Sequence, residues 1–410
     1  MAANNLTFNQ VSTILNAIQE QATGQKAITA TSTSDFVACA QTALKTGYDP
    51  LFNAISQVLG RTIFSVRPYT RKFKGLENNE TGYLNHTRKL AIADLSAVDA
   101  DPYKWPSCYD STNTGKETGD GESVDQYKIR KNKVLQTNIY GQNVYSDYYT
   151  IFKDQLDVAF SSPDEMARFW SMLVQNHSDM LEQWREDTAR ACLVNFIGGI
   201  IDEGKTERVV HLLTEYNALN GGSLTAQSVY APANFANFMS FVAARIGTVS
   251  ELMTERSVKY QTTVNGLIVP RHTPKSEQRL FVNTAQMKYR EAMAMPTIFH
   301  DSKVDSAQGI GVTEYVNFWQ SIDKPDSITV TASHIGADGT VKVSDAKTPV
   351  DKSGIFAVLL DREAAGYAPC GGWSSPTPFN ARGGYTNFFV HEREKVWNDH
   401  TEKGVVFILD

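Results

Sequence analysis

The sequence predicts a mixed α+β fold built around one long helix. Residues 161–199, SSPDEMARFWSMLVQNHSDMLEQWREDTARACLVNFIGG, carry three helix-start signals that agree: Ser162 suits the N-cap, Pro163 the first helical position, and Glu165 can complete a capping box. The apolar residues recur at spacings of three and four along the whole stretch. The flanking sequence is rich in β-branched and aromatic residues, which are typical of strands. We therefore expect one helical spine beside strands rather than an all-α core.

The spine helix is predicted to cover residues 163–197 and to end at Gly198 and Gly199. At 1.5 Å per residue it would be roughly 52 Å long, whereas the mean globular helix has only about 11 to 12 residues. Glu186 falls off the apolar stripe and is expected on the polar side. The spine core is predicted to consist of Phe169, Trp170, Leu173, Leu181 and Trp184.

Composition narrows the class of protein. The chain has 410 residues, 41% of them hydrophobic, which is enough for two or three compact units. The net charge of −6 argues against an overall cationic nucleic-acid binder. No apolar run reaches the ~18 residues that suggest a membrane helix, and Met-Ala-Ala-Asn-Asn at the start is not a signal peptide. We expect a soluble protein, cytosolic when made, that does not bind a membrane.

The first 140 residues are predicted to form two different parts. Residues 6–23 have helical periodicity and residues 36–60 read as short helices broken at Gly47 and Pro50, so 1–63 forms an N-terminal arm with short helices. Residues 64–140 have strand-like ends and a middle full of Pro, Gly, Ser, Thr and Asp, which predicts a long two-stranded ribbon. Such a ribbon is marginal alone in water. It must pack against another surface, and a neighbouring subunit is the obvious candidate.

The segment after the spine is predicted to alternate short helices and strands. A helix is expected from Pro232 and another over AQMKYREAMAM, residues 285–295, with short buried strands at NGLIVPRH and RLFVNT. SITVTASHIGADGTVKVS is typical of a hairpin that turns at Ala337 to Gly339. The final residues read as an aromatic strand, a charged stretch and an apolar strand.

No cluster of chemistry-bearing residues stands out in the sequence. The four cysteines lack the paired spacing of a zinc or redox site, and HEREKVWNDH lacks the HExxH spacing. Glycine-rich stretches such as CGGWSSP lack the other residues of phosphate-binding loops. A Ser/His/Asp triad has no fixed spacing that would reveal it. We expect no catalytic, cofactor or metal site, no enzymatic activity, and a core position for Cys192.

Two basic clusters lie on the predicted arms of the ribbon, in RPYTRKFK and KIRKNK, with aromatic residues between the charges. The pattern is compatible with nucleic-acid binding. Charges on an exposed ribbon also prevent edge-to-edge aggregation, and the acidic ETGDGESVD supplies the opposite sign, so pairing between subunits is favoured. The residues predicted for this intersubunit interface are Arg67, Arg71, Lys72, Lys74, Lys128, Arg130, Lys131 and Lys133.

The order of these parts resembles that of tailed-phage major capsid proteins with the Hong Kong 97-like fold, over essentially the whole chain. The likeness is closest to capsid proteins of small short-tailed phages. It is carried by LFNAISQVLGRTIFSVRPYTRKFKG, the spine from SSPDEMARFW to LVNFI, LFVNTAQMKYREAMAM, and GGYTNFFVHEREKVW with VVFIL. The resemblance implies an E-loop at 64–140, a P-domain at 141–204 with 385–410, and an A-domain at 205–384 with a small β insertion near 325–352.

The resemblance also implies partners and a location. The chain would assemble with itself, as pentamers and hexamers, into an icosahedral shell around double-stranded DNA, which it would contact non-specifically. A separate scaffolding protein, a portal and decoration proteins are further expected partners. Assembly would take place in the host bacterial cytoplasm and the product would be the virion capsid. The alternatives are an encapsulin-like nanocompartment shell and a soluble α+β enzyme with an unrecognised site.

Overall fold

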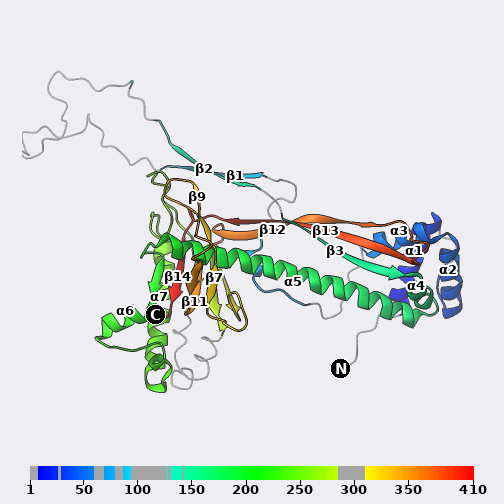
Figure 1. Ribbon diagram of the computed structural model, residues 1–410, viewed down its shortest axis with the longest axis horizontal. Helices are drawn as coiled ribbons and strands as arrows, with labels where there is room; N and C mark the ends of the chain where they lie inside the picture. The colour runs from blue at the N-terminus through cyan, green and yellow to red at the C-terminus, as the bar shows by residue number, and fades with distance from the viewer. Residues whose placement is uncertain are drawn as a thin grey trace, which may run out of the picture.

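The computed structural model describes residues 8–25, 29–59, 69–78, 86–93, 127, 131–140, 143–284 and 310–410. Figure 1 shows an elongated molecule in which one long helix, α5 (Pro163–Glu203), joins a group of helices at one end to a sheet-containing lobe at the other. The mixed α+β class with a long spine is confirmed. The helix predicted at residues 285–295 lies outside the described residues.

The regular elements follow one another in the order helices, ribbon, spine and mixed lobe. The other helices are α1 (Phe8–Thr23), α2 (Thr33–Lys45), α3 (Tyr48–Leu59), α4 (Lys153–Ala159), α6 (Leu212–Asn220) and α7 (Pro232–Thr254), with 3-10 turns η1 (Lys74–Leu76), η4 (Ser228–Tyr230) and η5 (Lys275–Glu277). The strands are β1 (His86–Ile92), β2 (Val134–Tyr140), β3 (Asn143–Phe152), β4 (Val209–His211), β5 (Gln278–Asn283), β6 (Val312–Val316), β7 (Ile328–Val330), β8 (Ser333–Ile335), β9 (Val341–Val343), β10 (Val350–Lys352), β11 (Ile355–Asp361), β12 (Ala365–Pro376), β13 (Tyr385–Asn398) and β14 (Gly404–Ile408).

The N-terminal helices match the sequence prediction except at Pro50. Helix α1 covers most of residues 6–23, and the break at Gly47 is present because this glycine has a φ of 99° between α2 and α3. Pro50, in contrast, lies within the first turn of α3. The first backbone N–H groups of a helix have no partner within it, so a proline is tolerated there.

The start of α5 agrees with the prediction, whereas its end does not. Ser162 is the N-cap, its side chain accepts a hydrogen bond from the backbone N–H of Glu165, and Pro163 is the first helical residue. The helix continues past the predicted end at 197 to Glu203, and Gly204 ends it with a φ of 69°. The glycines at 198 and 199 allow neighbouring segments to pack closely. A Cβ on Gly198 would lie 2.6 Å from Cγ1 of Val330.

The close packing at Gly199 gives a testable prediction. A Cβ there would lie 2.5 Å from Nε2 of His400, whose side chain is fully buried. We expect Gly199→Ala to lower the free energy of unfolding by about 1–3 kcal/mol, as overpacking does, in denaturation of the unassembled chain. Gly247→Ala in α7 is the matched control, because no atom other than the local backbone of α7 lies within 4 Å of its added Cβ. It should be neutral or stabilise by up to about 1 kcal/mol, and equal losses at both sites would contradict the packing argument.

Two sheets flank the spine. In the first, β12, β13 and β3 are antiparallel in that order, and β13 and β12 run alongside α5 (Figure 1). The second has the order β4-β14-β11-β5-β6, with parallel pairing only at its two edges. Strand β14 therefore shares a sheet with strands of residues 205–384, although the sequence prediction grouped residues 385–410 with the spine.

The five-stranded sheet is covered on both faces. Val358, Leu360 and Val406 belong to a core that includes the C-terminal part of α5, whereas the alternate residues Leu359 and Val405 belong to a core with α6 and α7. A third core holds α1 to α4 and the start of α5. The spine thus connects two separate cores.

Burial along α5 differs from the predicted continuous stripe. Phe169 and Trp170 are buried in the N-terminal core and Leu173 packs against it, but Leu181 is only half-buried. The prediction that Trp184 is a core residue is wrong. Its side chain is 38% exposed and its ring stacks on Tyr145 at 4.5 Å. Between its two cores α5 packs against the three-stranded sheet on one side, and part of its other side remains exposed to solvent.

The predicted hairpin at 327–344 is confirmed in its inner part. Strands β8 and β9 pair antiparallel, and Gly339, with a φ of 75°, lies in the turn between them. Outside this pair, β7 pairs with β10. These two short ladders occupy the region where a small β insertion was predicted.

Candidate assembly surfaces

The ribbon of β1 and β2 has two unlike faces. The strands pair in an antiparallel register from His86↔Tyr140 to Ile92↔Val134. On the inner face Ala91 packs with Leu135 against Val269 and Leu267. On the other face, here called the outer face, Leu90, Ile92 and Val134 are each more than half exposed. The ribbon therefore rests on a small apolar contact and leaves Leu90, Ile92 and Val134 in solvent.

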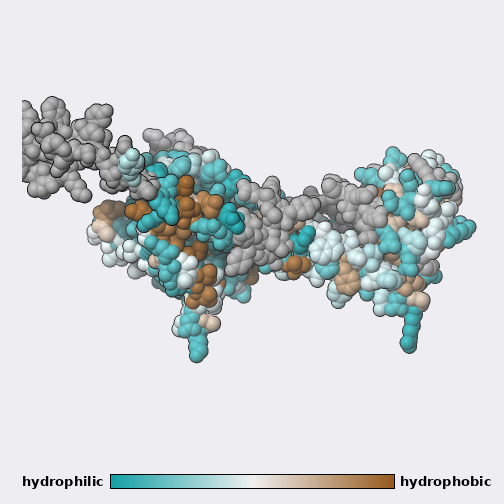
Figure 2. Space-filling model, turned by 90° about the horizontal axis from the view of Figure 1, so that it is seen from above, coloured by the Kyte–Doolittle hydropathy of each residue, from teal (hydrophilic) through white to brown (hydrophobic). Residues whose placement is uncertain are grey.

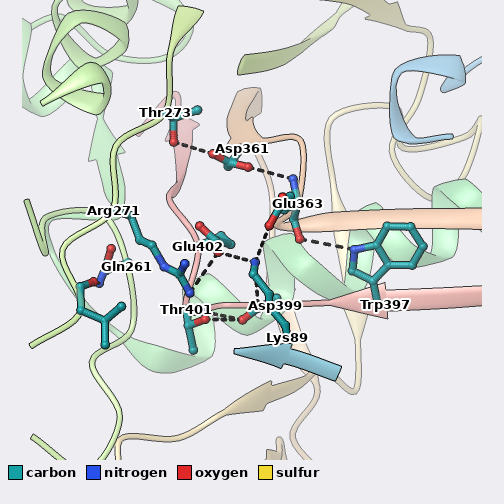
Figure 3. A network of polar contacts seen from close by, with 11 residues as sticks. Lys89, Gln261, Arg271, Thr273, Asp361, Glu363, Trp397, Asp399, Thr401 and Glu402 are labelled. Carbon is teal, nitrogen blue, oxygen red and sulfur yellow. Dashed lines mark hydrogen bonds and ion pairs between the residues drawn. The ribbon is translucent and has the colours of Figure 1, made fainter. Parts of the chain in front are cut away.

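A buried charge cluster, here called the Lys89 cluster, holds the inner face of the ribbon to the body (Figure 3). The Lys89 ammonium lies 3.3 Å from an oxygen of Asp399 and 2.8 Å from an oxygen of Glu363, and it also donates to Glu402. Asp399 and Glu402 are almost completely buried, and the guanidinium of Arg271 lies 3.1 Å from an oxygen of Glu402. The cluster therefore attaches β1 to the body of the subunit.

The electrostatics of the Lys89 cluster favour a charged lysine. Burial by itself lowers the pKa of Lys89, but the Asp399 and Glu402 carboxylates outweigh burial and raise this pKa above its usual value. Burial raises the pKa of Glu402, and Lys89 and Arg271 oppose that rise. Because each side offsets the desolvation of the other, removing the lysine would leave two buried carboxylates with too little compensation.

The basic segment at 69–78 does not lie on the ribbon, so the prediction that placed Arg71, Lys72 and Lys74 there is wrong. Phe73 and Leu76 are buried in the core beside α5, and this burial holds the segment on the body. Arg71 forms ion pairs with Glu182 and Glu77 of its own chain and donates to the Tyr367 hydroxyl at 2.8 Å. The Arg71 guanidinium is therefore already paired within its own subunit.

A row of carboxylates on α5 receives this segment. Asp179 accepts a hydrogen bond from the backbone N–H of Tyr69 at 2.8 Å. One turn and then two turns further along the helix come Glu182 and Glu186, whose spacings of three and four put all three on one face. Glu186 accepts from the Tyr69 hydroxyl at 2.7 Å and from the backbone N–H of Lys72 at 3.0 Å.

Glu186 is therefore buried, contrary to its predicted place on the polar side; only 4% of it is exposed. Its partner Arg190 is also buried, donates to the Phe318 carbonyl at 2.6 Å and lies over the Phe318 ring. Burial alone raises the pKa of Glu186, but the hydrogen bonds from Lys72 and Tyr69, together with Arg190, hold it below its usual value.

The remaining predicted interface residues fall into three groups. Lys74 is exposed in η1. Lys131 and Lys133 are exposed just before β2. The others, Arg67, Lys128 and Arg130, lie outside the described residues. The eight basic residues thus do not form one surface, and those that the structure describes on the ribbon are Lys131 and Lys133.

Nothing in the described part of the chain suggests a reaction centre. In these residues no group of three or more His, Cys, Asp or Glu side chains could hold a metal ion, and no helix is long and apolar enough to cross a bilayer. Burial raises the pKa of the Cys192 thiol to about 12, so it stays protonated at neutral pH. A cavity of about 500 Å³ near the Lys89 cluster is lined by arginines and carboxylates in near balance.

Comparison with known proteins identifies the fold and the family. Solved structures described as the capsid of Staphylococcus phage Andhra and as the head fiber and inner core protein gp22 of bacteriophage P68 match with TM-scores of 0.54 and 0.53. Each is 10% identical, and each match covers 85% of this chain and 87% of the other. At that identity the likeness shows the fold alone. A comparison with curated proteins gives no match. The family model for Phi29-like phage major capsid proteins matches residues 15–408, and the chain therefore belongs to that family.

Proposed function

We propose that this major capsid protein joins its neighbours in the shell through the β1–β2 ribbon, which acts as the E-loop. Of the predicted E-loop at 64–140, the segment at 69–78 stays on its own subunit, and the part from 86 to 140 would reach over an adjacent copy. The spine with the three-stranded sheet of β3, β12 and β13 would form the P-domain, and the rest of residues 205–384, without β12, would form the A-domain. Strand β14 would complete the A-domain sheet. The protein has a structural role and no enzymatic activity, and the encapsulin-like shell and the soluble enzyme gain no support from the family match.

One observation carries this proposal: the outer face of the ribbon exposes Leu90, Ile92 and Val134, while Ala91 and Leu135 on the inner face pack against the subunit's own body. A two-stranded ribbon is marginally stable alone in water. An exposed apolar strand pair is also a risk of aggregation unless another surface covers it. In a shell built from many copies of one chain, a neighbouring copy would bury these exposed apolar side chains.

The same shell needs other partners. We propose a separate scaffolding protein, a portal, decoration proteins, and assembly in the host bacterial cytoplasm. Contact with packaged DNA would be non-specific and weak, because the chain carries a net charge of −6 and like charges repel.

A deletion tests the role of the ribbon. Ala93 donates a backbone hydrogen bond to Lys133 at 2.9 Å, so the two strands lie side by side where they leave the body. We expect a chain in which a short glycine-rich turn replaces residues 94–130 to fold as the wild-type subunit does. Its particle yield should fall at least about tenfold, because a specific interface buries roughly 1,000 Å² or more and the deletion removes contact area. Circular dichroism and thermal melting would check the fold, and electron microscopy the particles. Particles at normal yield and size from this variant would contradict the E-loop role.

A further inference from the structure

The contact between the middle of α5 and the three-stranded sheet is polar. The apolar cores lie toward the two ends of the helix, and Figure 2 shows two bulky ends joined by a narrower middle. In that middle, ionisable side chains from several segments face one another and are here called the mid-spine layer. They are His177, Glu182 and Arg185 of α5, Tyr145 and Asp147 of β3, Tyr367 of β12, Glu392 and Glu394 of β13, and Arg71 of the segment at 69–78.

The four carboxylates of the mid-spine layer share two guanidinium groups. Arg71 pairs with Glu182 at the edge of the layer. The guanidinium of Arg185 lies 3.5 Å from an oxygen of Glu182, 3.9 Å from Glu392 and 3.5 Å from Glu394. Each of these three distances is longer than an ordinary charge-assisted hydrogen bond. The negative charge between α5 and the sheet is therefore only partly compensated.

Glu394 is the most deeply buried carboxylate of the layer. Its side chain is 2% exposed, whereas the other three carboxylates are 17–22% exposed. No described residue makes a hydrogen bond of ordinary geometry to either oxygen of Glu394. Burial raises the pKa of Glu394 above its usual value and Glu392 adds to the rise, whereas Arg185 and Thr188 oppose it. Glu394 therefore binds a proton more readily than an exposed glutamate does.

Tyr145 gives a second sign of excess negative charge. Its hydroxyl is buried and has no hydrogen-bond partner among the described residues. Burial, together with three carboxylates of the layer, raises the pKa of Tyr145 to about 12. His177 lies 3.6 Å from Asp147, which is too far for a hydrogen bond. The layer thus combines unsatisfied polar groups with poorly compensated charge.

We propose that Glu394, by gaining or losing a proton, controls how tightly α5 packs on the three-stranded sheet. With the proton bound, the buried charge is gone, the carboxyl can donate a hydrogen bond within the layer, and Arg185 is left to Glu182 and Glu392. Without the proton, the buried carboxylate weakens the contact, because its desolvation is not repaid. This device lies inside one subunit and is independent of the surface that the ribbon covers.

The direction of the pH effect follows from the raised pKa. The ordinary value for a glutamate is 4.5, and the folded-state pKa of Glu394 lies above it. The folded chain therefore holds this proton more tightly than the unfolded chain. The contribution of Glu394 to stability should be most favourable below 4.5 and should decline as the pH rises through the folded-state pKa.

Glu394→Gln tests the proposal, because it removes the charge and keeps the shape of the side chain. We expect the folding equilibrium constant of the unassembled variant, divided by that of the wild-type chain, to rise at least about fivefold from pH 4.5 to 7.5, since one pKa unit corresponds to tenfold. Denaturant titration at each pH measures this ratio, and any loss that does not depend on pH cancels. A ratio constant within twofold would overturn the proposal.

Glu392→Gln is the matched control. Glu392 lies on the same strand and also beside Arg185, but 17% of its side chain is exposed, so water solvates its charge. Its ratio should change less than about twofold over the same pH range. A change as large as that of Glu394→Gln would overturn the assignment to Glu394.

Hydrogen exchange of the wild-type chain provides a measurement that needs no variant. After correction for intrinsic exchange rates, protection of the amides over residues 179–188 should fall at least about threefold from pH 5 to 7.5, because the contact of this part of α5 loosens. Amides of β14, which lies in an apolar sheet, should keep their protection. Equal changes in both segments, or no change in α5, would contradict a pH-sensitive contact at the mid-spine layer.

Discussion

Glu186→Ala is expected to lower the free energy of unfolding of the unassembled subunit by about 3–5 kcal/mol, the usual cost of leaving a buried charge without its partner. In this variant Arg190 loses the Glu186 carboxylate with which it pairs. The Tyr69 hydroxyl and the backbone N–H of Lys72 also lose their hydrogen-bond acceptor. Denaturant titration would measure the change. Gln183→Ala, at an exposed position of the same helix, should cost under about 0.5 kcal/mol. Similar midpoints for the two variants would contradict the buried network.

A second variant distinguishes a lost pair from a lost charge. Glu186→Leu combined with Arg190→Met removes both charges, and such replacements are often neutral or even stabilising. We expect the double variant to be more stable than Glu186→Leu alone.

The pKa of Glu186 is lowered in the folded state. Its contribution should therefore be complete above the ordinary value of 4.5 and decline as the pH falls through the folded pKa.

Lys89→Gln is expected to cost roughly 3 kcal/mol, near the lower end for a broken buried pair, because Arg271 still lies beside Glu402. The pKa of Lys89 is raised above its ordinary value of 10.5. The lysine's stabilisation should therefore be fully present below about 10.5 and be lost as the pH rises beyond it. The difference in unfolding free energy between the wild-type chain and the variant should be constant from neutral pH to about 9 and shrink at more alkaline pH.

The exposed Lys131 on the same ribbon provides the control for Lys89. Lys131→Gln should change the free energy of unfolding by less than about 0.5 kcal/mol, with no alkaline dependence. Limited proteolysis would provide a second readout, since release of the ribbon from the body should speed cleavage in Lys89→Gln. Proteolysis as slow as in the wild-type chain would show that the cluster does not hold the ribbon.

Local signals predicted much of the fold. The N-cap at Ser162, the proline at 163 and the turn at Gly339 each act within a few residues, so the sequence alone located the start of the spine and the β8–β9 hairpin. The end of the spine depends on a distant segment. Gly198 and Gly199 are helix-ending residues by local rules, yet here they admit Val330 and His400, which lie far along the chain.

The interacting residues were harder to predict for the same physical reason. The periodicity of α5 suggested that Trp184 would face a core and Glu186 solvent, but the segment at 69–78 crosses the helix and buries the carboxylate instead. Tyr69 and Asp179, which this contact joins, are 110 positions apart. The opposite charges of these two segments held only part of the signal, because Glu182 pairs with Arg71, whereas Asp179 and Glu186 accept hydrogen bonds from Tyr69 and from the backbone N–H of Lys72.

Electron cryomicroscopy of particles assembled from the full chain tests the central claim most directly. The account predicts a closed shell of oligomeric capsomers in which Leu90, Ile92 and Val134 of each ribbon are buried against another copy of the chain. A shell in which these three side chains remain exposed to solvent would contradict it.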